Sequence, residues 1–188
     1  MAVQVVLFTD PVGAWIGAGG PAVYVASTAV VFLAVLRNVA IPGVAVIAIG
    51  AGISDGLGYG NNAKAALITR GMTEIRRLGV RLGANPRTFT GLAGYGDLIL
   101  TCTGDLSRNH TVGKKIGQGV RLSDILAQTR SVAEGVRTAK SVYDLSRQLG
   151  VEMPISHGTY RVLYEDLPPR EALYQLMTRD LKQELDDD

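Results

Sequence analysis

The stretch Val44-Ala45-Val46-Ile47-Ala48-Ile49-Gly50-Ala51-Gly52-Ile53 carries no charged side chain and is apolar on every side. A helix with apolar residues all round it is one that other elements surround, because none of its faces is suited to water. After residue 45 no strict alternation of apolar and polar residues indicates a strand. These ten residues and their surroundings therefore predict an all-α fold that includes a fully buried helix.

The density of charged residues along the chain rises sharply near residue 60. Only Asp10, Arg37 and Asp55 are charged among the first sixty residues, whereas the last 128 residues hold the other thirty-three charges. The 188 residues suffice for one domain with a core and are short for two. Only 6% of the residues are aromatic and 23 are glycine, so we expect a core of small aliphatic side chains and helices that approach closely.

Composition excludes several classes of protein. A net charge of +2 without long runs of like charge argues against nucleic-acid binding. The single cysteine, Cys102, rules out an internal disulfide and a thiolate metal cluster, and it fits a cytoplasmic protein. His110 and His157 lack a ligand-like spacing, so no metal is expected. The apolar run at 22–36 is shorter than the roughly 20 residues that a spanning helix needs, which argues against a membrane partner.

Residues 1–43 are interpreted as a leader or a degenerate remnant, and residues 44–188 as a helical domain. Residues 4–8 could form a short strand. The glycines at 17–20 lack the spacing of a dinucleotide-binding loop, and Pro21 follows them at once, so a flexible connector is favoured.

The second part of the chain predicts seven or eight helices from its three-to-four apolar spacing. Helices are expected over residues 61–82, near Arg87, from 107 to about 117, and over 124–128, 136–149, 154–164 and 170–181. The residues predicted to cap or open these helices are Asn61, Asn85 with Pro86, Ser107, Ser123, Pro154 and Pro168-Pro169.

Three features could carry chemistry. Asp97 and Thr101 are four apart and therefore share a helix face. The residues alone favour a simple N-cap for Asp97, and a role in chemistry is the alternative. Val132-Ala133-Glu134-Gly135 precedes a long helix, where Glu134 could serve a site or merely interact with the helix dipole.

Ser107-Arg108-Asn109 is the third feature. The free N–H groups of a helix start favour an anion, and arginine matches two phosphate oxygens at once. Lys114 and Lys115 lie one to two turns further along. A capped helix with a solvated arginine is the simpler alternative. Cys102 is expected to be buried and inert, and His157 to lie on a helix surface.

Together these segments resemble the bacterial NAD(P)-dependent glycerol-3-phosphate dehydrogenase family, in order and in spacing. The segments that carry the resemblance are Ala48–Gly58, Ala65–Gly71, Gly94–Thr103, Ser107–Asn109, Val132–Gly135 and Gly150–Ile155. The resemblance implies the helical substrate domain of a cytoplasmic oxidoreductase that interconverts glycerol 3-phosphate and dihydroxyacetone phosphate, in glycerophospholipid precursor synthesis, with NAD or NADP.

The resemblance also implies residue roles. It places Asp97, a buried acid, and Thr101 by the reacting carbon, and Ser107, Arg108 and Asn109 at the substrate phosphate. Arg108 also matches the cofactor site. Val132 and Glu134 match positions that contact the nicotinamide cofactor.

One departure from the family affects catalysis. The family's catalytic lysine precedes an Asn-Val-Ile-Ala-Ile stretch, and ungapped counting places Val44 at the lysine. A second register places Arg37 there, and arginine hardly deprotonates. The cofactor-binding half of the family is expected to be absent, so the chain is expected to be inactive alone.

Two alternatives remain open. One is a non-catalytic helical module that forms a homodimer or pairs with a full-length homologue. The other is a helical domain tethered to a membrane by residues 22–36.

Overall fold

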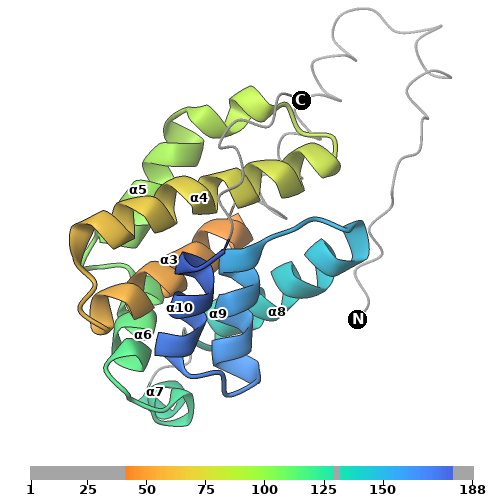
Figure 1. Ribbon diagram of the computed structural model, residues 1–188. Helices are drawn as coiled ribbons and strands as arrows, with labels where there is room; N and C mark the ends of the chain where they lie inside the picture. Colours follow the sequence, from red (N-terminus) through yellow and green to blue (C-terminus); the bar gives the residue numbers. More distant parts are fainter. Residues whose placement is uncertain (1–40, 129–131, 180–188) are drawn as a thin grey trace, which may run out of the picture. The chain divides into compact units, whose positions relative to one another are not determined.

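The computed structural model describes residues 41–128 and 132–179 (Figure 1). The possible strand at 4–8, the glycines at 17–20 and the apolar run at 22–36 lie outside these ranges. The described residues contain eight α-helices, a 3-10 turn and a π turn, and no strand, which confirms the all-α prediction. In chain order they are α3 (Ile41–Gly56), α4 (Gly60–Arg81), η2 (Pro86–Thr90), η3 (Leu92–Gly96), α5 (Asp97–Thr103), α6 (Arg108–Gly117), α7 (Leu122–Gln128), α8 (Val132–Leu149), α9 (Pro154–Tyr164) and α10 (Pro169–Met177).

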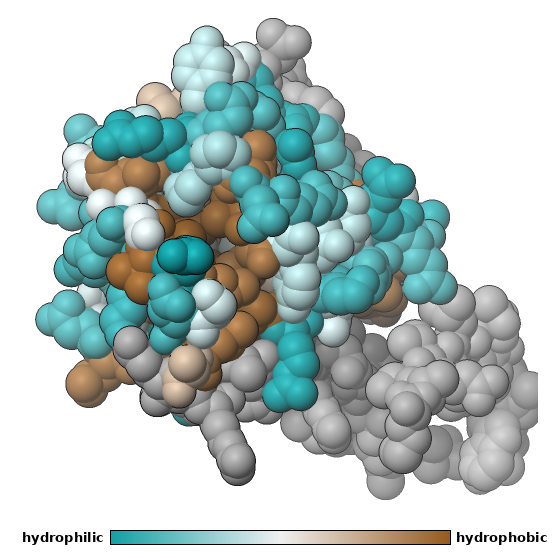
Figure 2. All heavy atoms as spheres, turned by 90° about the horizontal axis from the view of Figure 1, so that it is seen from below, coloured by the Kyte–Doolittle hydropathy of each residue, from teal (hydrophilic) through white to brown (hydrophobic). Residues whose placement is uncertain are grey.

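Helix α3 is the buried helix that the sequence predicted. Its residues Val46 to Ile49 have no exposed surface, and helices α4, α5, α6, α8 and α9 all pack against it. Figure 1 shows α3 in orange between α4 and the later helices. On the face shown in Figure 2, apolar side chains gather around a hollow and hydrophilic ones ring them.

Helices α3 and α6 approach so closely that their backbones touch. A Cβ atom added at Gly52 would overlap the carbonyl oxygen of His110, and one added at Gly113 would overlap that of Ile49. Gly56 and Gly117, one turn further along each helix, lie in the same kind of contact. Two glycines four residues apart on each helix therefore let the axes approach, as the glycine-rich composition predicted.

Helix α4 packs the predicted apolar face inward, with Ile68, Met72, Ile75 and Leu78 buried. The prediction that Asn61 caps this helix is wrong. Helix α4 already begins at Gly60, after Tyr59, and no side chain caps it. The physical reason is the glycine turn before it, because Gly58 and Gly60 take positive φ values and let the chain reverse without a capping side chain.

Other helix starts give mixed results. The Asn85 side chain accepts a hydrogen bond from the Arg87 amide at 3.0 Å, with Pro86 at the first position, as predicted, although the element is a 3-10 turn. The prediction that Ser123 caps the next helix is wrong. Helix α7 begins at Leu122, two residues before the predicted start, so Ser123 is helical and its hydroxyl donates to Asp124 at 3.3 Å.

Helix α9 confirms its predicted range, 154–164, whereas α8 and α10 differ from theirs by a few residues. Helix α8 begins at Val132, about one turn before the predicted start. Helix α10 begins at Pro169, one residue early, and ends at Met177. Within the described ranges, no helix combines the length and the apolar character that crossing a bilayer requires.

An aromatic cluster joins α8 to α9. Tyr143 stacks on Tyr160 with ring centroids 3.9 Å apart, and Tyr160 stacks on Tyr164. His157 meets Tyr143 edge-on, and its Nε2 lies 2.7 Å from the Ser146 hydroxyl. The prediction that His157 is a surface residue is therefore wrong. Its partial burial, followed by the charge of a nearby arginine, lowers its pKa.

The Glu74 side chain of α4 binds the first turn of α9. Its two carboxyl oxygens accept hydrogen bonds from the amides of Ile155 and Ser156, at 2.6 and 3.0 Å, and from the Ser156 hydroxyl. Glu74 is only 2% exposed. Loss of solvation raises its pKa from 4.5 to about 7, against the opposing effect of the hydrogen bonds. A titratable group thus holds two helices together inside the core.

Candidate functional site

Helix α5 continues directly from the π turn η3. This π turn lies in backbone contact with η2. A Cβ atom at Gly94 would overlap the Phe89 carbonyl oxygen. Turns of this kind are common at functional sites. The turn places Asp97 at the first position of α5.

Asp97 and Thr101 lie together on one face of α5, as their spacing predicted. The Thr101 hydroxyl donates to an Asp97 carboxyl oxygen at 3.4 Å. The N-cap interpretation is wrong, since Gly96 takes the cap position and Asp97 itself has helical angles. The expected burial is also wrong, because Asp97 is exposed and Thr101 half-buried. The backbone at Gly96 is already helical through the π turn, so no free helix start exists for Asp97 to cap.

Ser107 caps α6 as predicted. Its side-chain oxygen accepts a hydrogen bond from the His110 amide at 3.3 Å. Arg108 and Asn109 form the first turn, where helix amides lack partners within the helix. Arg108 is exposed and Asn109 half-buried. This end of α6 therefore has the free donors, the dipole and the charge that an anion needs.

Two other cationic residues that the sequence places on this helix lie far from the start of α6. Lys114 and Lys115 lie in the last turn of α6. They are therefore at the opposite end of the helix from Arg108 and do not add to the anion site.

A short turn brings the α5 pair close to the start of α6. The Gly104 amide donates to Leu100 and the Ser107 amide donates to Gly104, at 2.8 and 3.0 Å. Helices α5 and α6 also contact each other directly. The helices that carry the carboxyl–hydroxyl pair and the anion site are thus neighbours.

The start of α8 also meets the start of α6. A Cβ atom at Gly135 would overlap the side-chain oxygen of Asn109, so the amide lies against the α8 backbone. Val132 and Glu134 belong to the same first turn of α8. Two motifs far apart in sequence therefore meet at Asn109.

The change Gly135→Ala should weaken anion binding without destabilising the domain. The added methyl group would displace the Asn109 amide, while alanine is a better helix former than glycine. We expect about a threefold to tenfold rise in the dissociation constant for inorganic phosphate, from the loss of about one hydrogen bond. Titration followed by NMR measures it.

Gly158→Ala is the matched control for this change. A Cβ atom there meets only Leu176, at an ordinary 3.9 Å, and the residue lies in α9. Unchanged phosphate affinity in both variants would contradict a role for Asn109.

The sequence did not predict the ion cluster beneath this site. Asp55 of α3 lies 2.8 Å from Nε2 of the buried His110 and 2.6 Å from the Lys64 ammonium group. This cluster joins α3 and α4 to α6 beside Asn109. The available signal was that Asp55 is the only acidic residue after Asp10 in the first sixty.

The remaining candidates are inert. Val44 has a side chain with no exchangeable proton and is 5% exposed within α3. Cys102 is buried, as predicted, and burial raises its pKa to about 12, so the thiol stays protonated. Arg37, the alternative to Val44, lies outside the described residues. Among the described residues, no group of three histidine, cysteine or acidic side chains could hold a metal ion.

Comparisons with known proteins point in one direction. Residues 39–174 match the family model described as the NAD-dependent glycerol-3-phosphate dehydrogenase C-terminus. Glycerol-3-phosphate dehydrogenase [NAD(P)+] of Geobacter sulfurreducens is 65% identical over 139 residues, which cover 74% of this chain and 42% of the relative. That of Syntrophobacter fumaroxidans is 64% identical, over 75% of this chain and 42% of the relative.

A solved structure agrees with these relatives. The crystal structure of glycerol-3-phosphate dehydrogenase from Coxiella burnetii matches with a TM-score of 0.72 and 41% identity. The match covers 77% of this chain and 45% of that one. The chain thus spans about two fifths of the length of the curated relatives.

Proposed function

Because the chain belongs to the family of NAD-dependent glycerol-3-phosphate dehydrogenase C-terminal domains, we propose that the start of α6 holds the phosphate of a three-carbon phosphate ester. Arg108 offers two parallel N–H donors to phosphate oxygens, and the helix amides add fixed donors. Ser107 and Asn109 flank this arginine at the same helix end. The substrate class is glycerol 3-phosphate or dihydroxyacetone phosphate, which the names of the relatives support.

The meeting of α6 and α8 at Asn109 and Gly135 carries this proposal. It places the candidate phosphate site beside the turn that contains Val132 and Glu134. We assign that turn, with Arg108, to contact with NAD or NADP, which supplies or accepts the hydride when bound.

Asp97 and Thr101 are proposed to orient the substrate beside the phosphate site. Their hydrogen bond fixes the carboxylate on the exposed face of α5, where it can accept a hydrogen bond from a substrate hydroxyl. The dehydrogenase reaction also moves a proton on the substrate oxygen, which is general acid–base work. Val44 cannot do it, so we propose that this chain binds the substrate in the cytoplasm without turning it over.

Calorimetry and an activity assay together test this function. We expect Arg108→Gln to weaken glycerol 3-phosphate binding about tenfold or more, because a charge-assisted, two-pronged contact is lost. Arg121→Gln, an exposed arginine before α7, is the control and should bind as the unaltered chain does. Oxidation of NADPH with dihydroxyacetone phosphate should not exceed background. Equal affinities of the two variants would refute the phosphate site, and chain-dependent turnover would refute the inactivity.

A non-catalytic interaction module is the second candidate, supported by a different observation. Leu92, Leu100 and Leu106 are 88%, 69% and 98% exposed around α5. Large exposed apolar side chains can mark a protein interface. Native mass spectrometry would reveal a homodimer, and a strict monomer would count against this candidate.

A further inference from the structure

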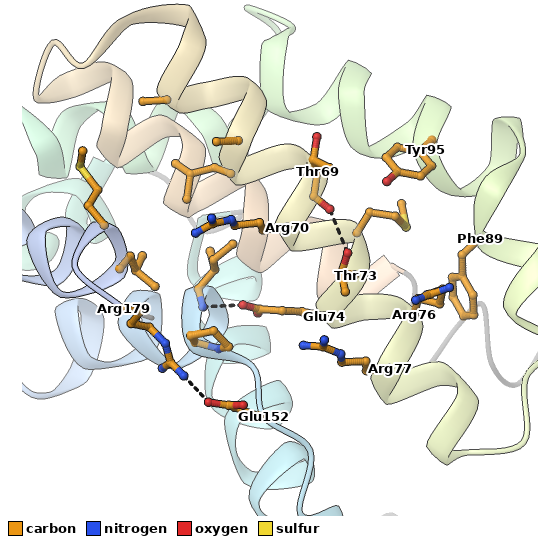
Figure 3. A pocket seen from close by; sticks show the side chains of 18 of the residues that line it. Thr69, Arg70, Thr73, Glu74, Arg76, Arg77, Phe89, Tyr95, Glu152 and Arg179 are labelled. Atoms are coloured by element: carbon orange, nitrogen blue, oxygen red, sulfur yellow. Dashed lines mark hydrogen bonds and ion pairs between the residues drawn. The ribbon is translucent and has the colours of Figure 1, made fainter. Parts of the chain in front are cut away.

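A pocket of about 590 Å³ lies on the outer face of α4, between η2, the start of α9 and the end of α10 (Figure 3). It is separate from the candidate functional site, because none of Asp97, Thr101 or Ser107–Asn109 lines it. Its wall is largely apolar and includes Leu67, Phe89, Leu173, Leu176 and Met177. A pocket of this volume with a largely apolar lining is typical of a binding site.

Four arginines distinguish this pocket from an ordinary apolar hollow, and we call it the arginine pocket. Arg70, Arg76 and Arg77 come from α4, and Arg179 follows α10. Arg179 forms an ion pair with Glu152. Within the described residues, no acidic side chain pairs with Arg70 or Arg76.

In the described part of the chain, the acidic side chains that line the pocket leave Arg70 and Arg76 without an acidic partner. Glu74 points toward the start of α9 in Figure 3, and its oxygens are taken up by the α9 amides and the Ser156 hydroxyl. Glu152 is the other acid on the wall. The arginine pocket therefore favours an occupant that is both negatively charged and partly apolar.

The chain itself supplies such a segment at the rim. The structure is described as far as Arg179, and the residues that follow are Asp-Leu-Lys-Gln-Glu-Leu-Asp-Asp-Asp. These nine residues hold five acids against one lysine, and Leu181 and Leu185 lie four apart. We propose that residues 180–188 dock into the arginine pocket, with the leucines on its apolar wall and the acids on its arginines.

Geometry and tethering favour this occupant over a free one. Nine residues can extend about 30 Å, which is enough to cross a pocket of 590 Å³ from its rim. A segment joined to the rim has an effective concentration of about millimolar. Carboxylates meet guanidinium groups in parallel pairs of hydrogen bonds, so each acid that reaches an arginine adds orientation as well as charge.

Zero-length cross-linking of the full chain tests the proposal. Arg70→Lys and, separately, Arg76→Lys keep the positive charge and introduce an amine that carbodiimide can join to a nearby carboxylate. Arg121→Lys, outside the pocket, is the control. Circular dichroism verifies that each variant folds. Mixtures of isotope-labelled and unlabelled chains distinguish links within a chain from links between chains.

We expect peptides that join residue 70 or 76 to 180–188 at about five times the yield of those that join residue 121, mostly within one chain. The yield should fall in 1 M salt, where the screening length is about 3 Å. Equal yields at 70, 76 and 121 would overturn the proposal. Links formed only between chains would overturn it too, and would assign the pocket to a second copy.

Discussion

Replacing Gly113 with alanine is expected to lower the free energy of unfolding by about 3 kcal/mol or more, enough to prevent folding of a marginal domain. A methyl group at this position would overlap the Ile49 carbonyl oxygen. The obstacle is backbone and cannot turn aside as a side chain could. Helices α3 and α6 would have to separate, which would also loosen the Gly52 contact with His110.

Urea unfolding followed by circular dichroism measures this effect. Gly91→Ala is the control, because a Cβ atom there has no neighbour within 4 Å and its φ of −92° suits any residue. We expect the control to change stability by less than about 0.5 kcal/mol. If Gly113→Ala were as mild, the close crossing of α3 and α6 would not be what holds the fold.

Stability is expected to fall as the pH rises from about 4.5 through 7, and Glu74→Gln should remove that fall. The folded pKa of Glu74 is about 7, above its unfolded value of 4.5, so the folded state holds the proton more strongly. This contribution is complete below pH 4.5 and is lost as the pH rises through 7. Its size is about 3 kcal/mol, at about 1.4 kcal/mol for each pKa unit.

The measurement is a series of urea unfolding curves between pH 4.5 and 8. Glutamine keeps one acceptor oxygen, for either the Ile155 or the Ser156 amide, and does not titrate. Glu171→Gln on the exposed face of α10 is the control, since its neighbour Gln175 can donate to either side chain. If the unaltered chain and Glu74→Gln showed the same pH slope, Glu74 would not be the group that titrates.

Features of the fold that depend on local pattern could be predicted. The all-apolar run at 44–53 indicated a buried helix because burial on every side requires apolar residues on every side. Ser107 and Asn85 were identified as caps because their bonds reach only two or three residues along the chain. The Asn61 prediction failed because a glycine turn precedes α4, and the Ser123 prediction failed because α7 begins two residues earlier than predicted.

Features that depend on tertiary contacts could not be predicted. Glu74 binds amides 81 and 82 positions away, and Asp55 meets His110 across 55 residues. No local spacing encodes such pairs. The Asp97–Thr101 pair was predicted from helix periodicity, whereas the exposure of Asp97 depends on which elements cover α5. The roles of these residues toward substrate and cofactor remain predictions.

The central position of α3 has a consequence for synthesis of the chain. Helix α3 ends at Gly56, and α9, one of the helices that cover it, begins at Pro154. At the usual rate of translation, the ribosome needs about 5 to 20 s to make the residues between them. During that interval the other helices do not yet cover α3 completely, and part of its apolar surface remains exposed to water. The order of synthesis thus exposes the most buried helix of the finished domain to aggregation until the helices that cover it have been made.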